Sequence, residues 1–169
     1  MKIAILYGTK YGTTEKVVES ISKLIKNHNK DDNGSIDVKL INLKENDDVN
    51  LDCDVLIIGS SLYMGRIRKE VRNFLKKYKD ILIEKHFALF ICGVNEVEGI
   101  KQVNDVFPSE ILDYSIATVF LGGELNLDKM KFLDKKIAQL IIKGADKEFK
   151  IDDVAIDEFV QKIKSSIDY

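Results

Sequence analysis

Three threonines and two glycines lie within the seven residues Gly8-Thr9-Lys10-Tyr11-Gly12-Thr13-Thr14, close to the N-terminus. The segment follows an apolar run at 2–7 and precedes a helical pattern. A loop that ends at a helix N-terminus presents unpaired backbone N–H groups and the positive end of the helix dipole, and both attract anions. The threonines add hydroxyl donors, and Gly12 lets the backbone approach a ligand closely. The composition of this loop predicts a phosphate-binding site.

The spacing separates this loop from two common nucleotide-binding motifs. It does not end in the Gly-Lys-Ser/Thr of a P-loop, and Gly8 and Gly12 are too far apart for G-x-G-x-x-G. Mostly uncharged donors suit one terminal monophosphate without magnesium. The alternative is that Thr13 or Thr14 only caps the following helix, which leaves the other hydroxyls unexplained.

The elements around the loop follow from hydrophobic periodicity. Strands are predicted at 2–7, 36–43, 54–60, 86–94 and 115–123, and helices at 12–27, 66–79, 128–142 and 156–167, with Gly144 ending the third helix. The stretch 95–112 is polar with a helical tendency. Strands alternate with helices, and the central strands are continuously apolar. We therefore expect an α/β fold, a doubly wound five-stranded parallel sheet in three α/β/α layers, forming one domain over residues 1–169.

Three loops follow predicted parallel strands, at 8–14, 59–65 and 93–99, and all are rich in Gly, Ser or Asn. In open parallel sheets, ligands bind outside the carboxyl ends of the strands, where the strand order reverses. We expect the three loops to form one site.

Bulk composition excludes several classes of protein. A net charge of −2 and a pI near 5.8 argue against a nucleic-acid binder, and no apolar stretch approaches a membrane span of about 20 residues. The N-terminus lacks a signal-peptide pattern, so a cytoplasmic protein is expected. Cys53 and Cys92 adjoin apolar runs, as inert buried thiols do, and their spacing does not suit a metal. Cys92 is the better candidate for a ligand role, because it falls at a strand end.

The loop Thr9-Lys10-Tyr11-Gly12-Thr13-Thr14 resembles the phosphate-loop signature of the flavodoxin family at each position. The resemblance implies the flavodoxin-like strand order 2-1-3-4-5 and FMN as the cofactor, with its phosphate in this loop. It also implies that the next two strand-end loops flank the isoalloxazine ring. Those loops would be Ser60-Ser61-Leu62-Tyr63-Met64-Gly65 and, at the start of the second, Gly93-Val94-Asn95.

Two features depart from the family pattern. The usual first flavin loop has an aromatic residue directly before a glycine, whereas here Met64 separates Tyr63 from Gly65; the second loop lacks the common stacking tyrosine. Either Tyr63 or Met64 could therefore pack on the ring. The alternatives are that Tyr63 is a surface residue, that Met64 belongs to the core, and that Gly65 only begins the next helix.

A closer likeness is to the flavodoxin-type, menaquinone-dependent protoporphyrinogen dehydrogenases. It rests on the segments 59–65, 120–123 and 143–146 and on the acidic tail. Those enzymes carry a basic, aromatic-rich insertion after the fifth strand that suits a membrane-bound quinone. Here the corresponding stretch, 124–128, is acidic and has no aromatic residue before Phe132. The likeness supports fold and cofactor and leaves the substrate open.

Three functions are compatible with the sequence. The sequence favours an FMN-dependent electron-transfer protein that shuttles electrons between redox partners, because a bound flavin carries the chemistry without acid–base or nucleophilic residues. The alternatives are a quinone-linked oxidoreductase of the protoporphyrinogen dehydrogenase type and a non-enzymatic receiver-like module, which would need clustered acids after its first strand. The expected partner is a redox protein or a quinone. The basic stripe Lys69, Arg72, Lys76 and Lys79 suits an acidic partner, a peripheral membrane contact or simply a solvated helix face.

Overall fold

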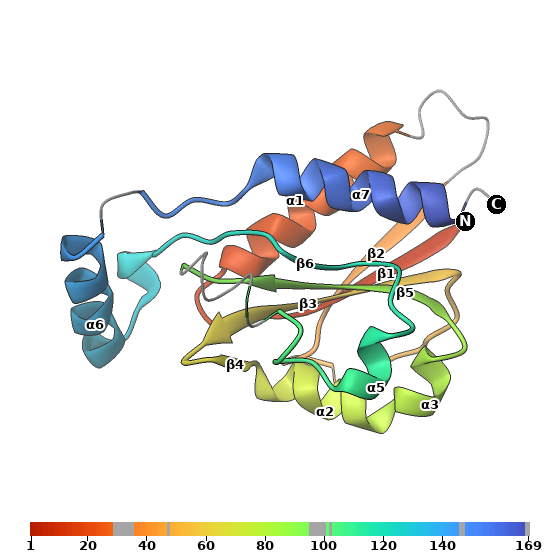
Figure 1. The fold of residues 1–169 in the computed structure, drawn as a ribbon, viewed down its shortest axis with the longest axis horizontal. Helices are drawn as coiled ribbons and strands as arrows, with labels where there is room; N and C mark the ends of the chain where they lie inside the picture. The colour runs from red at the N-terminus through yellow and green to blue at the C-terminus, as the bar shows by residue number, and fades with distance from the viewer. Residues whose placement is uncertain (29–35, 47, 95–100, 102, 146–147, 168–169) are drawn as a thin grey trace.

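A twisted sheet forms the centre of the molecule, with strands in the order β2-β1-β3-β5-β6 and with β4 paired to β3 (Figure 1). The computed structural model describes residues 1–28, 36–46, 48–94, 101, 103–145 and 148–167. The strands are β1 (Lys2–Gly8), β2 (Asp37–Asn42), β3 (Val55–Tyr63), β4 (Arg66–Ile67), β5 (His86–Cys92) and β6 (Thr118–Phe120). The helices are α1 (Thr13–His28), α2 (Lys69–Lys77), α3 (Lys79–Leu82), α5 (Ser109–Leu112), α6 (Phe132–Lys143) and α7 (Asp153–Ile167), with a 3-10 turn, η1 (Leu127–Lys129).

The predicted fold class and strand order are confirmed. β1 pairs in parallel with β2 and β3, β5 pairs in parallel with β3 and β6, and the five strands follow the predicted order. β4 is an additional two-residue strand, antiparallel to the end of β3.

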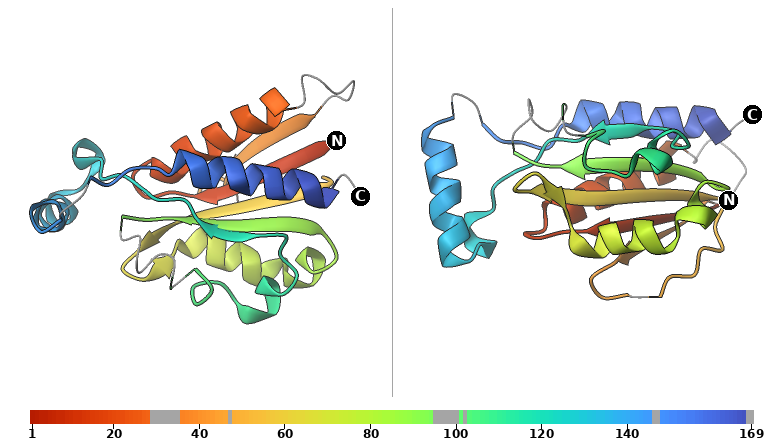
Figure 2. Two further views of the ribbon diagram at one scale, coloured as in Figure 1. Left: turned by 45° about the horizontal axis from the view of Figure 1, so that its top comes forward. Right: turned by 60° about the horizontal axis from the view of Figure 1, so that its bottom comes forward.

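Alternate residues of the central strands point to opposite faces of the sheet, and each face has its own core. One core joins the side chains of Ile5, Ile57 and Phe90 to α1 and α7, and the other joins Leu6 and Ile58 to α2, α3 and α5. Figure 2 shows the same two helical layers from two other directions. The continuous apolar runs of the strands are thus explained by burial on both faces.

The helix predicted at 66–79 is shorter than expected and divided. Ile67 lies in β4, α2 begins at Lys69, and Tyr78 separates α2 from α3. The side chains of Ile67 and Val71 are nevertheless both buried, because a hairpin and a helix bring them to the same face. The strand predicted at 115–123 is regular only over Thr118–Phe120.

Residues 124–145 and 148–150, together called the excursion below, leave the end of the sheet and return to it. Gly122 forms an antiparallel bridge with Ile151, and the Gly123 N–H donates to the Lys150 carbonyl (3.0 Å). Between these points lie η1 and α6, where a single helix was predicted over 128–142. Gly144 caps α6, as expected. α6 does not cover a face of the sheet but stands beyond the carboxyl ends of the strands (Figures 1 and 2).

Because α6 lies off the sheet, much of its apolar surface is exposed. Leu133 and Leu140 are 72% and 71% exposed, and Ala138 is the one residue of α6 that is buried. Within the described ranges, no helix combines the length and the apolar character needed to cross a membrane.

Candidate functional site

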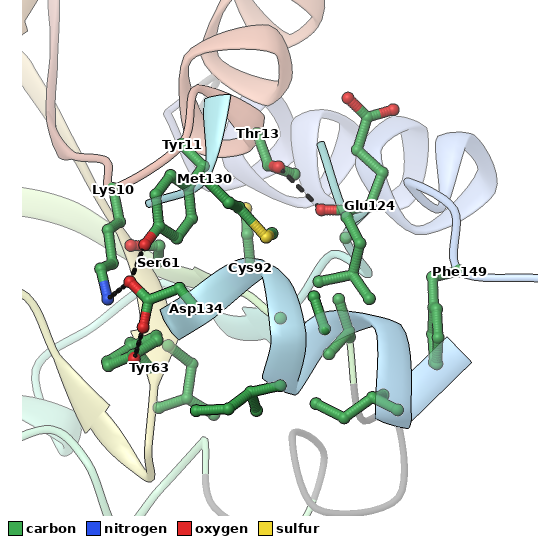
Figure 3. Close-up of a pocket in the computed structure, with 18 of the residues that line it drawn as sticks. Lys10, Tyr11, Thr13, Ser61, Tyr63, Cys92, Glu124, Met130, Asp134 and Phe149 are labelled. Carbon is green, nitrogen blue, oxygen red and sulfur yellow. Dashed lines mark hydrogen bonds and ion pairs between the residues drawn. The ribbon is translucent and has the colours of Figure 1, made fainter. Parts of the chain in front are cut away.

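A cavity of about 780 Å³ opens at the carboxyl ends of β1, β3 and β5, with the excursion as its outer wall (Figure 3). Its size lies within the range of about 300–1,000 Å³ that is typical of sites for small molecules and cofactors. The three predicted loops meet here. The residues they supply are Thr9, Lys10, Tyr11, Thr13, Ser61, Leu62, Tyr63, Met64, Gly65, Gly93 and Val94.

The loop after β1 has the geometry of an anion cradle. Gly12 has φ +93°, and its N–H donates to the Thr9 hydroxyl oxygen (3.0 Å), which leaves the Thr9 proton for another acceptor. The Lys16 N–H donates to the Gly12 carbonyl (3.1 Å) as α1 begins. The N–H groups of residues 13–15 therefore lie at the open, positive end of the helix.

The threonines of this loop differ in their surroundings. The Thr13 hydroxyl donates to the Glu124 carbonyl (3.1 Å), so it ties the loop to the excursion. Thr14 is fully buried, and among the described residues its hydroxyl interacts with the Cys92 thiol, a weak partner, and with no nitrogen or oxygen atom; the Ser61 hydroxyl in the cavity wall is also buried and has no partner among them. A buried hydroxyl without a partner costs about 1–3 kcal/mol. Such groups are expected where a ligand completes the structure.

The loop after β3 turns sharply at Met64 and Gly65. Both have positive φ, 50° and 70°, and they join Tyr63 to its pairing partner Arg66 in a two-residue hairpin. Positive φ at both central positions is typical of a type I′ turn. The Met64 side chain is 83% exposed at the rim of the cavity, so Met64 is not a core residue, and Gly65 belongs to the turn, not to a helix.

Asp134, on α6, joins the first two loops to the excursion. Its carboxylate accepts hydrogen bonds from the hydroxyls of Tyr11 and Tyr63 (2.5 Å to Tyr63) and pairs with the Lys10 ammonium (2.9 Å), as Figure 3 shows. Tyr11, Tyr63 and Lys10 together hold the pKa of the Asp134 carboxyl well below its usual range. The Lys10 ammonium also lies 3.1 Å from the centroid of the Tyr63 ring. One face of that ring is therefore covered by a cation.

The third wall of the cavity forms at the end of β5. Cys92 is buried in the wall, and burial raises the pKa of its thiol to about 12, so the thiol stays protonated and unreactive near neutral pH. The Gly93 N–H donates to the Gly122 carbonyl (2.9 Å). A Cβ added to Gly123 would lie 2.6 Å from the Gly93 carbonyl oxygen, so these two backbones approach each other too closely for a side chain.

Four predicted site residues lie outside the cavity wall or outside the described residues. Gly12 and Thr14 shape the loop behind the wall. Ser60 is fully buried, where its hydroxyl accepts the Arg68 N–H (2.9 Å) and donates to the Ser61 carbonyl (3.1 Å). Asn95 lies outside the described residues. The roles of these four, like those of the predicted residues that line the cavity, stay predictions as far as cofactor binding is concerned.

The excursion supplies cavity residues that sequence reasoning missed. They include Glu124, Leu125, Met130, Asp134, Ile137, Ala138, Ile141 and Phe149. A signal was present: two helical patterns follow the fifth strand, at 128–142 and 156–167, whereas one helix suffices to cover that edge of the sheet. The helix at 128–142 is therefore not needed to cover the sheet and could lie beyond the strand ends.

The fold and the three strand-end loops define a doubly wound α/β protein with a cavity at the carboxyl ends of its parallel strands. The model of the flavodoxin domain family matches residues 4–152, and the chain belongs to this family. A flavodoxin of Clostridium saccharobutylicum is 29% identical over 100 residues, which cover 59% of this chain and 59% of that protein. The chain thus matches less than two thirds of the length of this curated relative.

Solved structures share the fold. A short-chain flavodoxin associated with a bacterial microcompartment has a TM-score of 0.61 at 14% identity, and 99% of each chain is covered. A flavodoxin of Fusobacterium nucleatum bound to flavin mononucleotide has a TM-score of 0.53 at 18% identity, covering 98% of each chain. At this level of identity the likeness concerns the fold.

Proposed function

We propose that this chain is an FMN-dependent electron-transfer protein that passes electrons between redox partners. The observation that carries the proposal is the meeting of the three strand-end loops at one cavity, with the buried, unpartnered hydroxyl of Ser61 in its wall. Family membership and the flavin mononucleotide in a related structure support the same cofactor. When bound, FMN supplies the one- and two-electron chemistry.

The residues of the chain fit this cofactor. The open N-terminal turn of α1, with the Thr9 hydroxyl in the cavity wall and the Thr14 hydroxyl directly behind it, would hold the phosphate. Ser61 and the backbone of Gly93 and Val94, in the cavity wall, would offer hydrogen-bond partners to the polar edge of the ring. Apolar side chains on both sides, among them Leu62 and Ile137, would exclude water from the ring.

Tyr63 and Met64 have different positions relative to a bound ring. One face of Tyr63 is covered by Lys10, and its hydroxyl is held by Asp134, so this side chain is fixed in the cavity wall. Met64 lies at the rim and makes the backbone turn. We propose that Tyr63 provides the aromatic wall of the site and that Met64 faces the redox partner.

The proposal is tested by titrating the apo-protein with FMN. Thr14→Val removes the Thr14 hydroxyl, whose one interaction among the described residues is with the Cys92 thiol, and keeps the shape of the side chain. The apo-protein should be as stable as wild type or more stable by about 1 kcal/mol, while FMN affinity falls about tenfold, because a hydrogen bond to a charged phosphate is lost. The control is Thr118→Val, whose hydroxyl contacts Ser115 (2.9 Å) and lies outside the cavity wall. It should lower stability and leave FMN affinity unchanged. Absence of saturable FMN binding by the wild type would refute the proposal.

A second candidate is a quinone-linked FMN oxidoreductase of the protoporphyrinogen dehydrogenase type. One observation favours it: the excursion follows the fifth strand and lines the cavity with Met130, Ile137 and Ile141, a surface suited to an apolar reactant. The FMN-loaded protein, once reduced, should then be reoxidised by a water-soluble menaquinone analogue with saturation kinetics. A rate that is linear in quinone concentration would favour the carrier function.

A further inference from the structure

The excursion contacts the phosphate loop at three points. The Glu124 carboxylate pairs with the Lys16 ammonium, and the Glu124 backbone carbonyl accepts a hydrogen bond from the Thr13 hydroxyl. Asp134 pairs with Lys10. The third contact is Lys129, in η1, whose ammonium would lie 3.0 Å from a Cβ added to Gly12. Lys129 is 117 residues away from Gly12 in sequence, so only the return of the chain past the strand ends brings it there.

Three lysines lie in the loop or beside it, and they differ in whether a carboxylate balances their charge. The ammonium groups of Lys10 and Lys16 are each paired with a carboxylate of the excursion. Lys129 makes no ion pair or hydrogen bond through its side chain with any residue that the structure describes. The loop therefore has one ammonium beside it whose charge is not already balanced by a neighbouring carboxylate.

The geometry of η1 brings the Lys129 side chain to the loop. The Lys129 N–H donates to the Asn126 carbonyl (3.2 Å), and the Met130 N–H donates to the Leu127 carbonyl (3.3 Å). The turn directs Met130 into the cavity wall and Lys129 towards Gly12. Gly12 has no side chain to separate the ammonium from the loop, whose Thr9 hydroxyl and Gly12 backbone lie at the open N-terminus of α1.

From this arrangement we propose that Lys129 completes the phosphate site and makes it selective for the phosphorylated flavin over riboflavin. The inference rests on the proposed FMN function. A phosphate monoester carries nearly two negative charges at neutral pH, and a charge-assisted contact to it is stronger than a contact between neutral groups. The phosphate would also hold η1 against the loop, at the outer wall of the cavity.

The test compares FMN and riboflavin, which differ only in the phosphate. Lys129→Met should weaken FMN binding about tenfold and leave riboflavin binding unchanged, as measured by quenching of flavin fluorescence. The matched control is Lys131→Met, which removes the same charge from an exposed position in the same excursion. Lys129→Arg should retain most of the FMN affinity. Raising NaCl should weaken FMN binding more steeply in wild type than in Lys129→Met.

The outcomes distinguish the role of Lys129 from the proposed binding of FMN. Equal loss of FMN and riboflavin affinity in Lys129→Met, or equal effects of the Lys129 and Lys131 variants, would overturn the role of Lys129 while leaving FMN binding intact. If wild type binds riboflavin and FMN equally well, the selectivity is refuted. If wild type binds neither, both the proposed function and this inference fail.

Discussion

Replacing Gly122 with alanine should loosen the attachment of the excursion to the sheet. Gly122 has φ +69°, a conformation that costs an L-residue about 1–2 kcal/mol. Its added Cβ would lie 2.5 Å from the Lys150 carbonyl oxygen and 3.0 Å from the Asp152 nitrogen. Both are backbone atoms, so the clash can be relieved only by separating the two chain segments.

The magnitude follows from the bonds at this junction. Separation breaks the hydrogen bonds from the Gly123 N–H to Lys150 (3.0 Å) and from the Asp152 N–H to Leu121 (3.1 Å). Each is worth about 1 kcal/mol net, so with the backbone strain the free energy of unfolding should fall by about 3 kcal/mol. For a chain of 169 residues this corresponds to a decrease in Tm of about 6–12 °C.

The assay is thermal and urea unfolding followed by circular dichroism, with Gly144→Ala as the matched control. Gly144 caps α6 at φ −95°, and its added Cβ would meet only carbonyl oxygens at 3.6 and 3.9 Å. This variant should change stability by less than about 1 kcal/mol, with the sign towards stabilisation. A Gly122→Ala protein as stable as wild type, or an equal loss in Gly144→Ala, would refute the described junction.

Two further predictions concern the turn and the pH dependence. Met64→Asn places a residue that tolerates positive φ before Gly65, and little packing is lost because the Met64 side chain is 83% exposed. The free energy of unfolding, measured in urea, should therefore rise by about 0.5–1 kcal/mol. An unchanged free energy of unfolding would show that contacts of the Met64 side chain stabilise the turn. Burial and the hydrogen bond to Glu15 (3.1 Å) raise the pKa of Tyr7 to about 12, above its ordinary value near 10. Its contribution to stability is therefore complete below about pH 10 and is lost as the pH rises towards 12, and Tyr7→Phe should lose less stability between pH 9 and 11.5. Parallel pH profiles for the two proteins would contradict this.

The sequence by itself determined the sheet and the position of its binding edge. Continuous apolar runs such as 54–60 and 86–94 can be satisfied only by strands that are buried on both faces, which requires helices on both sides. The small and hydroxyl-bearing residues of 8–14 then fall at the end of the first strand, and parallel strands bring such ends together. Local pattern sufficed here, because each conclusion depends on residues that are neighbours in the chain.

Only the tertiary structure decided where the excursion lies. The helical period at 128–142 predicts a helix, but the same apolar stripe would suit a helix on the sheet or one beside a cavity. The pairing of Asp134 with Lys10 joins residues 124 positions apart, and the approach of Lys129 to Gly12 depends equally on how the chain returns to the bridge between Gly122 and Ile151. Contacts of this kind are set by the packing of whole elements, which periodicity along the chain does not encode.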